Sequence, residues 1–299
     1  MTKSVKKALK NTEKSLKNKH SDNRIKTDKL SNIPIYIICY NRLSYLQKII
    51  QWLEKYNLNN IHIIDNCSSY PPLLEYLKKT PYKVHKMKEN LGHMVFFKAD
   101  EFKQIRENEY YILTDPDVIP IEECPIDFIN YFFQILQNYP NATKVGFSLK
   151  TDDLNENMPT TEVIRKWEKQ FYKKKLTTNP PYLYDSCLDT TFAMYRPMKK
   201  ITKDNFYKAI RTGYPYEARH LPWYKDLSVL DEEDEFYNKT DAGSGNWNNL
   251  ANLDCLKDEL ISRKPNSILE NIFSVKKSYR RIIIRFLWFK FTINCHKRQ

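Results

Sequence analysis

Short apolar runs alternate with segments of helical periodicity along the first half of the chain, and this alternation constrains the fold more than any other feature. The predicted strands are 33–39, 61–64, 82–85, 110–114 and 144–149, and the predicted helices are 43–56, one opened by the Pro-Pro pair at 71–72, 93–106 and 125–138. Strands and helices that alternate in this way form mostly parallel sheets through right-handed crossovers. We therefore predict an α/β, Rossmann-like domain with a mostly parallel central sheet flanked by helices.

The formal net charge of +13 is concentrated at the two ends of the chain. Residues 1–30 hold ten Lys and Arg against three Asp and Glu, residues 273–299 hold eight Lys and Arg and no acid, and residues 31–272 hold 31 basic and 33 acidic residues. A nearly neutral middle argues against a nucleic-acid groove across the folded part, so we expect no nucleic-acid partner. We divide the chain into a basic polar leader at 1–30, disordered or loosely helical, a domain at 31–272 with halves 31–150 and 151–272, and a basic aromatic tail at 273–299.

The tail interleaves Lys and Arg with large aromatic side chains between residues 276 and 291. No run of 18 or more apolar residues occurs in the chain, so we expect no membrane-spanning helix. We predict that 276–291 forms an amphipathic helix, either on an anionic membrane surface or packed on the domain. The six cysteines lack CxxC spacing and the N-terminus lacks an apolar signal stretch, which favours reduced thiols and a cytoplasmic protein, peripheral on the inner face of the cytoplasmic membrane.

Polar residues follow the predicted strands at their carboxyl ends, where ligands bind in sheets of this kind. These residues are Tyr40, Asn41 and Arg42, then Asp65 and Asn66, then Asn90, Gly92 and His93, and finally Asp115 and Asp117. Asp115 and Asp117 flank a proline that stiffens the turn, and their hard carboxylate oxygens suit Mg²⁺ or Mn²⁺ shared with substrate phosphates. The structural alternatives are solvated aspartates in a turn, a helix N-cap at Asn41 and an Asx-turn at Asp65.

Four sequence segments occur in order along the first half: Ile-Cys-Tyr-Asn-Arg, Ile-Ile-Asp-Asn-Cys-Ser-Ser, Glu-Asn-Leu-Gly-His and Leu-Thr-Asp-Pro-Asp. Their order and spacing resemble nucleotide-sugar glycosyltransferases of the GT-A fold, above all the large inverting family 2 and its relatives. The likeness covers residues 33–150 well and 185–250 more loosely. It implies nucleotide-sugar contacts from Tyr40, Asn41, Arg42, Asp65, Asn90, Gly92, His93 and Asp115. It also implies a divalent cation, Mn²⁺ or Mg²⁺, on Asp117 and on the late histidine His220.

An inverting transfer also needs a carboxylate that takes the proton of the attacking acceptor hydroxyl. The resemblance favours Asp189, which lies just before an apolar segment, although this aspartate is also compatible with a helix or turn cap. Glu217, Asp231 and Glu232 are further candidates. The acidic run at 231–235 is also typical of a solvated helix start.

Acceptor contacts are expected from Glu217 and from the Gly-Ser-Gly-Asn-Trp segment at 243–247, which is otherwise a plain loop. In this segment Asn246 would bond to sugar hydroxyls and Trp247 would pack on a sugar face. Arg219, beside His220, is a candidate partner for a phosphate.

These features together predict a metal-dependent inverting glycosyltransferase. Its donor is a nucleoside diphosphate sugar, with UDP-hexose or UDP-N-acetylhexosamine favoured, and its acceptor is a saccharide hydroxyl, lipid-linked in surface polysaccharide or lipooligosaccharide assembly. One alternative is a retaining enzyme of the same fold. Another is a sugar-phosphate nucleotidyltransferase, although the usual Gly-rich loop after the first strand is missing. A third is a non-catalytic protein that binds membrane or nucleic acid through its basic tails.

Overall fold

The structure is a computed structural model. It describes residue 30 and residues 32–158, 160–188, 191–226 and 229–240, together with the backbone of three further strands at 273–278, 281–286 and 289–294. The predicted leader at 1–30 therefore lies outside the described residues except for Leu30, whose side chain is buried.

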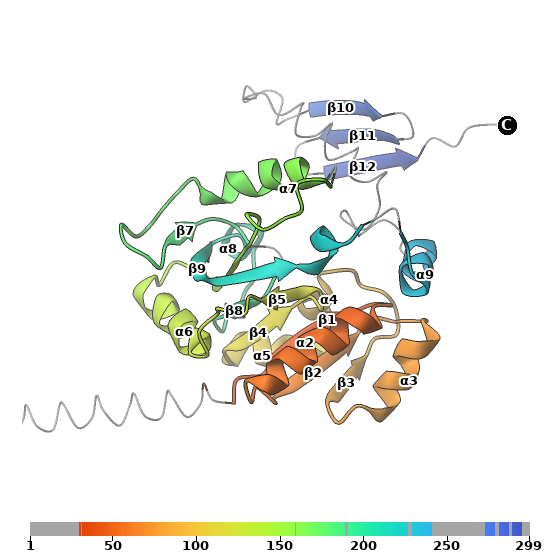
Figure 1. Cartoon of the computed structure of the whole chain (residues 1–299), viewed down its shortest axis with the longest axis horizontal. Helices are drawn as coiled ribbons and strands as arrows, with labels where there is room; N and C mark the ends of the chain where they lie inside the picture. The colour runs from red at the N-terminus through yellow and green to blue at the C-terminus, as the bar shows by residue number, and fades with distance from the viewer. Residues whose placement is uncertain are drawn as a thin grey trace, which may run out of the picture.

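The central sheet and its helices occupy residues 35–240 (Figure 1). Its strands are β1 (Ile35–Cys39), β2 (Ile61–Asp65), β3 (Lys83–Lys86), β4 (Tyr111–Thr114), β5 (Val118–Pro120), β6 (Lys144–Leu149), β7 (Leu183–Asp185), β8 (Ala193–Tyr195) and β9 (Ala209–His220). The α-helices are α2 (Leu43–Lys55), α3 (Pro71–Lys79), α4 (Val95–Lys98), α5 (Lys103–Asn108), α6 (Phe128–Asn138), α7 (Thr161–Glu168), α8 (Lys203–Phe206) and α9 (Glu232–Thr240). Short 3-10 helices occur at η1 (Asp100–Phe102), η2 (Lys169–Tyr172) and η3 (Leu221–Tyr224).

The strands follow the order β3-β2-β1-β4-β8-β6-β9-β5, with β7 paired to β9. The strands β1 to β4 pair in parallel, and β6 pairs in parallel with β9. The antiparallel pairings are made by β5, β7 and β8. The predicted fold class is confirmed: a mixed α/β protein with a curled central sheet flanked by helices, consistent with a Rossmann-like GT-A fold.

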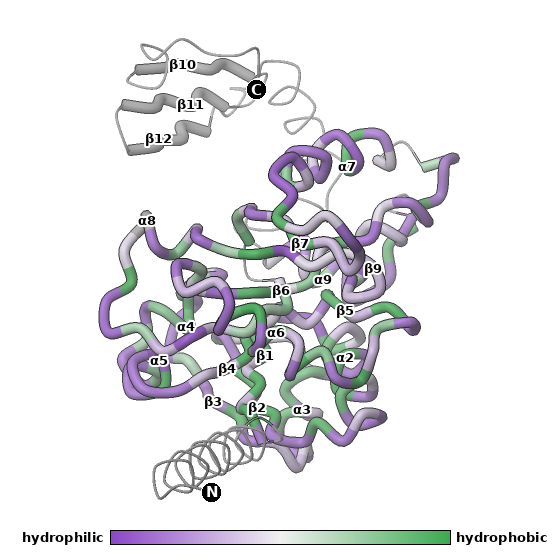
Figure 2. The backbone as a smooth tube through the Cα atoms, turned by 90° about the vertical axis from the view of Figure 1, so that its left-hand side faces the viewer, coloured by the Kyte–Doolittle hydropathy of each residue, from purple (hydrophilic) through white to green (hydrophobic). Residues whose placement is uncertain are grey.

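Alternate side chains of the parallel strands face two separate hydrophobic layers. In β1, Ile35 and Ile37 belong to the core that contains the apolar sides of α2, α3 and α6. The intervening Tyr36 and Ile38 belong to the core formed with α4 and η1 on the other face. Because both faces of β1 are covered, all five of its residues are buried, and a continuous apolar run is the sequence pattern that such a strand requires. Figure 2 shows the hydrophobic residues gathered along the middle of the sheet.

The helix predicted at 93–106 is interrupted, and this prediction is corrected to α4, η1 and α5. The break lies at Ala99, whose backbone is extended with φ −74° and ψ 129°. The guanidinium of Arg106 donates to the carbonyl oxygens of Phe96 and Ala99, so a side chain supplies the hydrogen bonds that a continuous helix would supply from its backbone.

The amphipathic helix predicted at 276–291 is wrong. The backbone there forms an antiparallel three-stranded sheet of β10 (Phe273–Ser278), β11 (Arg281–Phe286) and β12 (Phe289–Asn294). Consecutive isoleucines and aromatic residues favour the pleated strand over the helix, and this preference outweighs the charge pattern on which the helix prediction relied. Among the residues that the structure describes, no helix is both long and apolar enough to cross a membrane.

Candidate active site

The loops that leave β1 and β2 lie against each other at the carboxyl edge of the sheet. The backbone N–H of Asn66 donates to the carbonyl of Cys39 (2.9 Å), and the N–H of Asn41 donates to the hydroxyl of Ser68 (3.1 Å). Asn41 and Cys67 both have positive φ, at 51° and 66°, which turns each loop sharply as it leaves its strand. The structure therefore brings the predicted segments 40–42 and 65–66 together at one edge.

The side chain of Asn41 ties this edge to the start of α3. Its amide oxygen accepts hydrogen bonds from the backbone N–H groups of Ser69 (2.7 Å) and Tyr70 (2.9 Å), and its Nδ2 donates to Thr240 Oγ1 (3.0 Å). Asn41 is not the N-cap of α2, because Arg42 holds that position without a side-chain cap bond. The helix that Asn41 helps to begin is α3, an arrangement that spacing along the chain does not reveal.

Asp65 is buried at 4% exposure, and one of its carboxylate oxygens accepts the backbone N–H of Ser68 (2.9 Å). The turn expected as its structural alternative is thus present. The other carboxylate oxygen forms no hydrogen bond with the residues that the structure describes. A role for Asp65 in nucleotide binding stays a prediction.

Asn66 organises the loop that carries the predicted diphosphate contacts. Its Nδ2 donates to Asn90 Oδ1 (2.8 Å) and to the carbonyl of Gly92 (3.2 Å), while its Oδ1 accepts the N–H of Leu91 (3.0 Å). Gly92 has φ +72°, a conformation that side chains disfavour, so glycine suits this position. Asn90 and Gly92 therefore lie beside the β2 edge, whereas the side chain of His93 is exposed.

Asp117 and His220, 103 residues apart in sequence, face each other across the β5–β9 pairing. In that pairing Val118 lies opposite His220, and the N–H of Leu221 donates to the carbonyl of Asp117 (2.8 Å). His220 Nε2 lies 3.4 Å from Asp117 Oδ2, with side-chain exposures of 15% and 18%. Asp115 follows the last residue of β4, two residues before Asp117, and its side chain is half-buried.

The electrostatics of this pair favour an ionised aspartate. Burial by itself raises the pKa of Asp117, but the contact with His220 and the more distant Arg42 outweigh burial and lower the pKa. The other ring nitrogen of His220, Nδ1, is buried without a hydrogen-bond partner in the described structure. Asp117 therefore offers an ionised carboxylate oxygen directly beside an imidazole nitrogen.

Among the described residues, Asp117 and His220 supply two ligands for a divalent cation. The remaining ligands of such an ion would have to come from elsewhere, such as the substrate or water. The 3.4 Å separation of Asp117 and His220 is close to the roughly 3.0 Å edge between neighbouring ligands held about 2.1 Å from one ion. Within the described ranges no group of three or more His, Cys, Asp or Glu side chains is placed to hold a metal. Two protein ligands completed by phosphate oxygens and water are the usual pattern for Mg²⁺-type sites.

Glu217 lies on β9, three residues before His220, and is half-buried. Ser148 donates its hydroxyl to this carboxylate (3.2 Å). Burial raises the pKa of Glu217, against the opposing effects of Ser148 and Lys150. A carboxyl group with a raised pKa is suited to proton transfer, but residues three apart on a strand point to opposite faces, so β9 does not bring Glu217 and His220 together. The roles of Glu217 as base or acceptor contact stay predictions.

Arg219 is committed to two carboxylates of the protein. Its Nη1 lies 2.6 Å from Glu122 and its Nε lies 2.9 Å from Asp153. The expectation that Arg219 pairs with a phosphate has no support from this arrangement, because the guanidinium already has its anionic partners.

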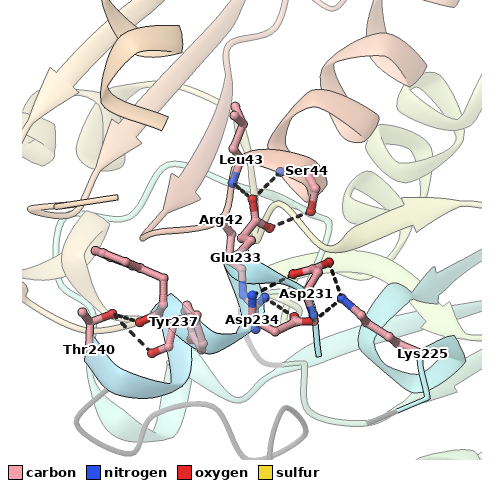
Figure 3. Close-up of polar contacts among 10 residues, drawn as sticks. Arg42, Leu43, Ser44, Lys225, Asp231, Glu233, Asp234, Tyr237 and Thr240 are labelled. Carbon is pink, nitrogen blue, oxygen red and sulfur yellow. Dashed lines mark hydrogen bonds and ion pairs between the residues drawn. The ribbon is translucent and has the colours of Figure 1, made fainter. Parts of the chain in front are cut away.

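The acidic run at 231–235 does begin a helix, α9, but the expectation that it is solvated is wrong for its two central residues. Glu233 and Asp234 are 8% and 4% exposed. Glu233 accepts hydrogen bonds from the N–H groups of Leu43 (2.8 Å) and Ser44 (2.9 Å) and from the Ser44 hydroxyl (2.6 Å). Its carboxylate therefore caps the N-terminus of α2, where the helix dipole favours negative charge (Figure 3).

Asp234 forms a buried ion pair with Arg42 at 2.6 Å. The guanidinium of Arg42 also lies 3.9 Å from the ring centre of Tyr237, and Lys225 contacts Asp234 from the other side (Figure 3). Asp231 accepts the N–H of Asp234 (2.8 Å) and thereby helps to start α9. Of the further base candidates, Asp231 thus has a capping role and an ion pair with Lys225, and Glu232 is exposed.

Sequence reasoning missed Glu233 and Asp234 as site-forming residues. A signal was present at helical spacing, because Glu233, Phe236, Tyr237 and Thr240 share one face of a helix. Phe236 packs against Tyr70 with ring centres 5.0 Å apart, so this face is the packed one. Three predicted residues, Asp189, Asn246 and Trp247, lie outside the described residues.

The sequence matches no protein-family model and no curated protein. Among solved structures, the chain is similar to 4-diphosphocytidyl-2C-methyl-D-erythritolsynthase from Anaerococcus prevotii DSM 20548, with 9% sequence identity and a TM-score of 0.33. The match covers 70% of this chain and 96% of that one.

Proposed function

We propose that this chain is a metal-dependent, inverting glycosyltransferase that moves a sugar from a nucleoside diphosphate sugar to a saccharide hydroxyl. UDP-hexose or UDP-N-acetylhexosamine is the proposed donor, and a lipid-linked saccharide of surface polysaccharide or lipooligosaccharide assembly is the proposed acceptor. The resemblance of four sequence segments supplies this hypothesis, and the arrangement of the carboxyl edge of the sheet supports it.

The observation that carries the proposal is the Asp117–His220 contact at 3.4 Å, beyond the end of β4. A carboxylate oxygen joined by an imidazole nitrogen suits Mn²⁺ better than Mg²⁺. When bound, such an ion would neutralise charge on the departing diphosphate. In this proposal Asp117 and His220 hold the ion, and the 40–42, 65–66 and 90–92 loops surround the nucleotide sugar.

The proton of the acceptor hydroxyl needs a carboxylate. Asp189 remains the candidate favoured by the resemblance. Glu217 is the candidate within the described residues, and burial raises the pKa of its carboxyl group, but its side chain and that of His220, three residues apart on β9, point to opposite faces of the strand. The same residue would orient the acceptor before transfer.

The α2 N-terminus favours glycosyl transfer over the nucleotidyltransferase alternative. Enzymes with a Gly-rich loop at this position hold phosphates on the backbone N–H groups that open the helix. Here the N–H groups of Leu43 and Ser44 already donate to Glu233. A phosphate therefore finds these two N–H groups of α2 occupied, and in this proposal it is held through the ion on Asp117 and His220.

Thermal unfolding with a panel of nucleoside diphosphates, with and without Mn²⁺, tests the proposal. We expect one diphosphate to raise the Tm of the wild-type protein only with Mn²⁺, because a ligand that binds the folded state alone stabilises it by mass action. Asp117→Asn should abolish this rise and the turnover, whereas the control Asp152→Asn, at an exposed carboxylate on the surface, should preserve both. Absence of a rise with every diphosphate, or full turnover by folded Asp117→Asn, would refute the proposal.

We also propose that the protein works at the inner face of the cytoplasmic membrane, attracted by its basic ends. Cosedimentation with vesicles containing phosphatidylglycerol, compared with neutral phosphatidylcholine vesicles, tests this location. Equal binding to both kinds of vesicle, or none, contradicts it.

A further inference from the structure

Every residue of the loop that joins β1 to α2 bonds to the distant helix α9. The hydrogen bonds are Tyr40 Oη to the Thr240 carbonyl (3.2 Å), Asn41 Nδ2 to Thr240 Oγ1 (3.0 Å), Arg42 Nη1 to Asp234 Oδ1 (2.6 Å), and Leu43 N (2.8 Å), Ser44 N (2.9 Å) and Ser44 Oγ (2.6 Å) to Glu233. We call residues 40–44, which are the joining loop together with the first two residues of α2, the β1–α2 loop. This loop contains three of the residues that sequence similarity assigns to the nucleotide.

The bonds in this contact involve buried charges, which makes the contact hard to break. Arg42, Glu233 and Asp234 are each less than 9% exposed. Separating α9 from the loop would break the Arg42–Asp234 ion pair and the three hydrogen bonds to Glu233, and among the described residues Asp234 would keep only Lys225 as a charged partner. A ligand that displaced α9 would have to compensate for these lost contacts.

The contact also determines what the β1–α2 loop can offer a ligand. The guanidinium of Arg42 is bound by Asp234 and covered by Tyr237, and the N-terminal N–H groups of α2 are bound by Glu233. Asn41 is buried, with both acceptor positions of its amide oxygen in use. Contacts with α9 therefore determine the conformation of the β1–α2 loop.

We propose that α9 is a positioning element of the nucleotide site, with Glu233 and Asp234 as positioning residues that hold the β1–α2 loop in its binding conformation. This inference rests on the proposed function for the identity of the ligand. It departs from the alternative in which α9 occupies the nucleotide site and must leave before the ligand enters. The two cases predict opposite effects of weakening the contact.

Glu233→Gln tests the proposal, with Glu232→Gln as the matched control. The control changes the adjacent residue of the same helical turn, whose side chain is exposed. Two readouts are needed at a temperature well below unfolding: the Kd of UDP with Mn²⁺ by calorimetry, and amide hydrogen exchange of the segment containing Leu43 and Ser44. A purely structural contribution would lower the Tm without changing the Kd of the folded protein.

Loss of one charge-assisted set of hydrogen bonds should weaken UDP binding about tenfold or more and speed exchange at Leu43 and Ser44. Glu232→Gln should stay within about twofold of wild type in Kd. Glu233→Asp, which keeps the charge, should recover part of the affinity. Asp234→Asn gives the same two readouts if Glu233→Gln does not fold.

Unchanged or tighter UDP binding in a folded Glu233→Gln variant overturns the positioning role, and tighter binding identifies α9 as an occupant of the site. If the wild-type protein binds no nucleoside diphosphate, the proposed function fails instead. In that event the exchange measurement still decides the claim about the loop: unchanged exchange at Leu43 and Ser44 overturns it.

Discussion

Acidification should destabilise the protein through His62 on β2, which lies between β1 and β3. His62 Nε2 lies 3.1 Å from Asn60 Oδ1, and its Nδ1 lies 3.0 Å from Nε2 of His85 on β3, whose own Nδ1 contacts Glu101. These contacts are satisfied when neutral His62 donates to Asn60 and accepts from His85. A second proton on His62 would set two N–H donors against each other, beside Lys83.

The size of the effect follows from the pKa. Burial, then the charges of His85 and Lys83, lowers the pKa of His62 from 6.5 to about 4. In the unfolded chain His62 takes up its proton as the pH falls through 6.5, whereas the folded protein resists protonation down to about pH 4. The stabilisation is thus complete above pH 6.5 and is lost as the pH falls toward 4, with a loss of about 2 kcal/mol by pH 5.

Urea unfolding at pH 7.5 and pH 5.0 measures this loss, with His62→Gln as the variant that cannot titrate. Between the two pH values the wild-type protein should lose about 2 kcal/mol more free energy of unfolding than the variant. His93→Gln, at an exposed histidine, should behave like the wild type. If His62→Gln loses as much stability as the wild type, the pH dependence does not come from His62 and the reasoning is wrong.

Two substitutions test the packing of the second half of the sheet. Gly146→Ala on β6 would place its Cβ 2.6 Å from the carbonyl oxygen of Phe192, so we expect a loss of about 1–3 kcal/mol in urea unfolding, and an unchanged midpoint contradicts this close approach. Glu168→Gln breaks a fully buried ion pair with Arg211 (2.8 Å) and should cost about 3–5 kcal/mol, whereas Glu162→Gln, at an exposed pair, should leave the midpoint of urea unfolding nearly unchanged. Equal effects of the two glutamate variants would show that the burial of Glu168 is energetically irrelevant.

The first half of the fold was predictable because its inner strands β1, β4 and β6 are buried on both faces and so leave a clear apolar pattern. The interruption at Ala99 was not, because it depends on where the Arg106 guanidinium lies in three dimensions. The strands at 273–294 were missed for a different reason. The charged residues interleaved with aromatic ones suggested an amphipathic helix, and the β propensity of the isoleucines and aromatic residues was given too little weight.

The candidate site was predictable where it follows strand ends and unpredictable where it depends on distant pairing. The resemblance predicted that Asp117 and His220 lie together, and the structure places their side chains 3.4 Å apart. Their role as metal ligands remains a prediction. The helical spacing of Glu233 with Phe236, Tyr237 and Thr240 indicated a packed face, but nothing near Glu233 in the sequence identified the partner of its carboxylate. Its partner is the N-terminus of α2, which lies about 190 residues earlier.

The contact between α9 and the β1–α2 loop has a consequence for synthesis of the protein on the ribosome. Arg42 and the first turn of α2 emerge early, but Asp234 and Glu233 are translated some 190 residues later. The nascent amino-terminal segment must therefore wait with an unmatched guanidinium and an uncapped helix until nearly the whole sheet has been made. The contacts of the loop can form only after α9 has left the exit tunnel. An amino-terminal half produced alone would therefore lack the partners of Arg42 and of the α2 N-terminus.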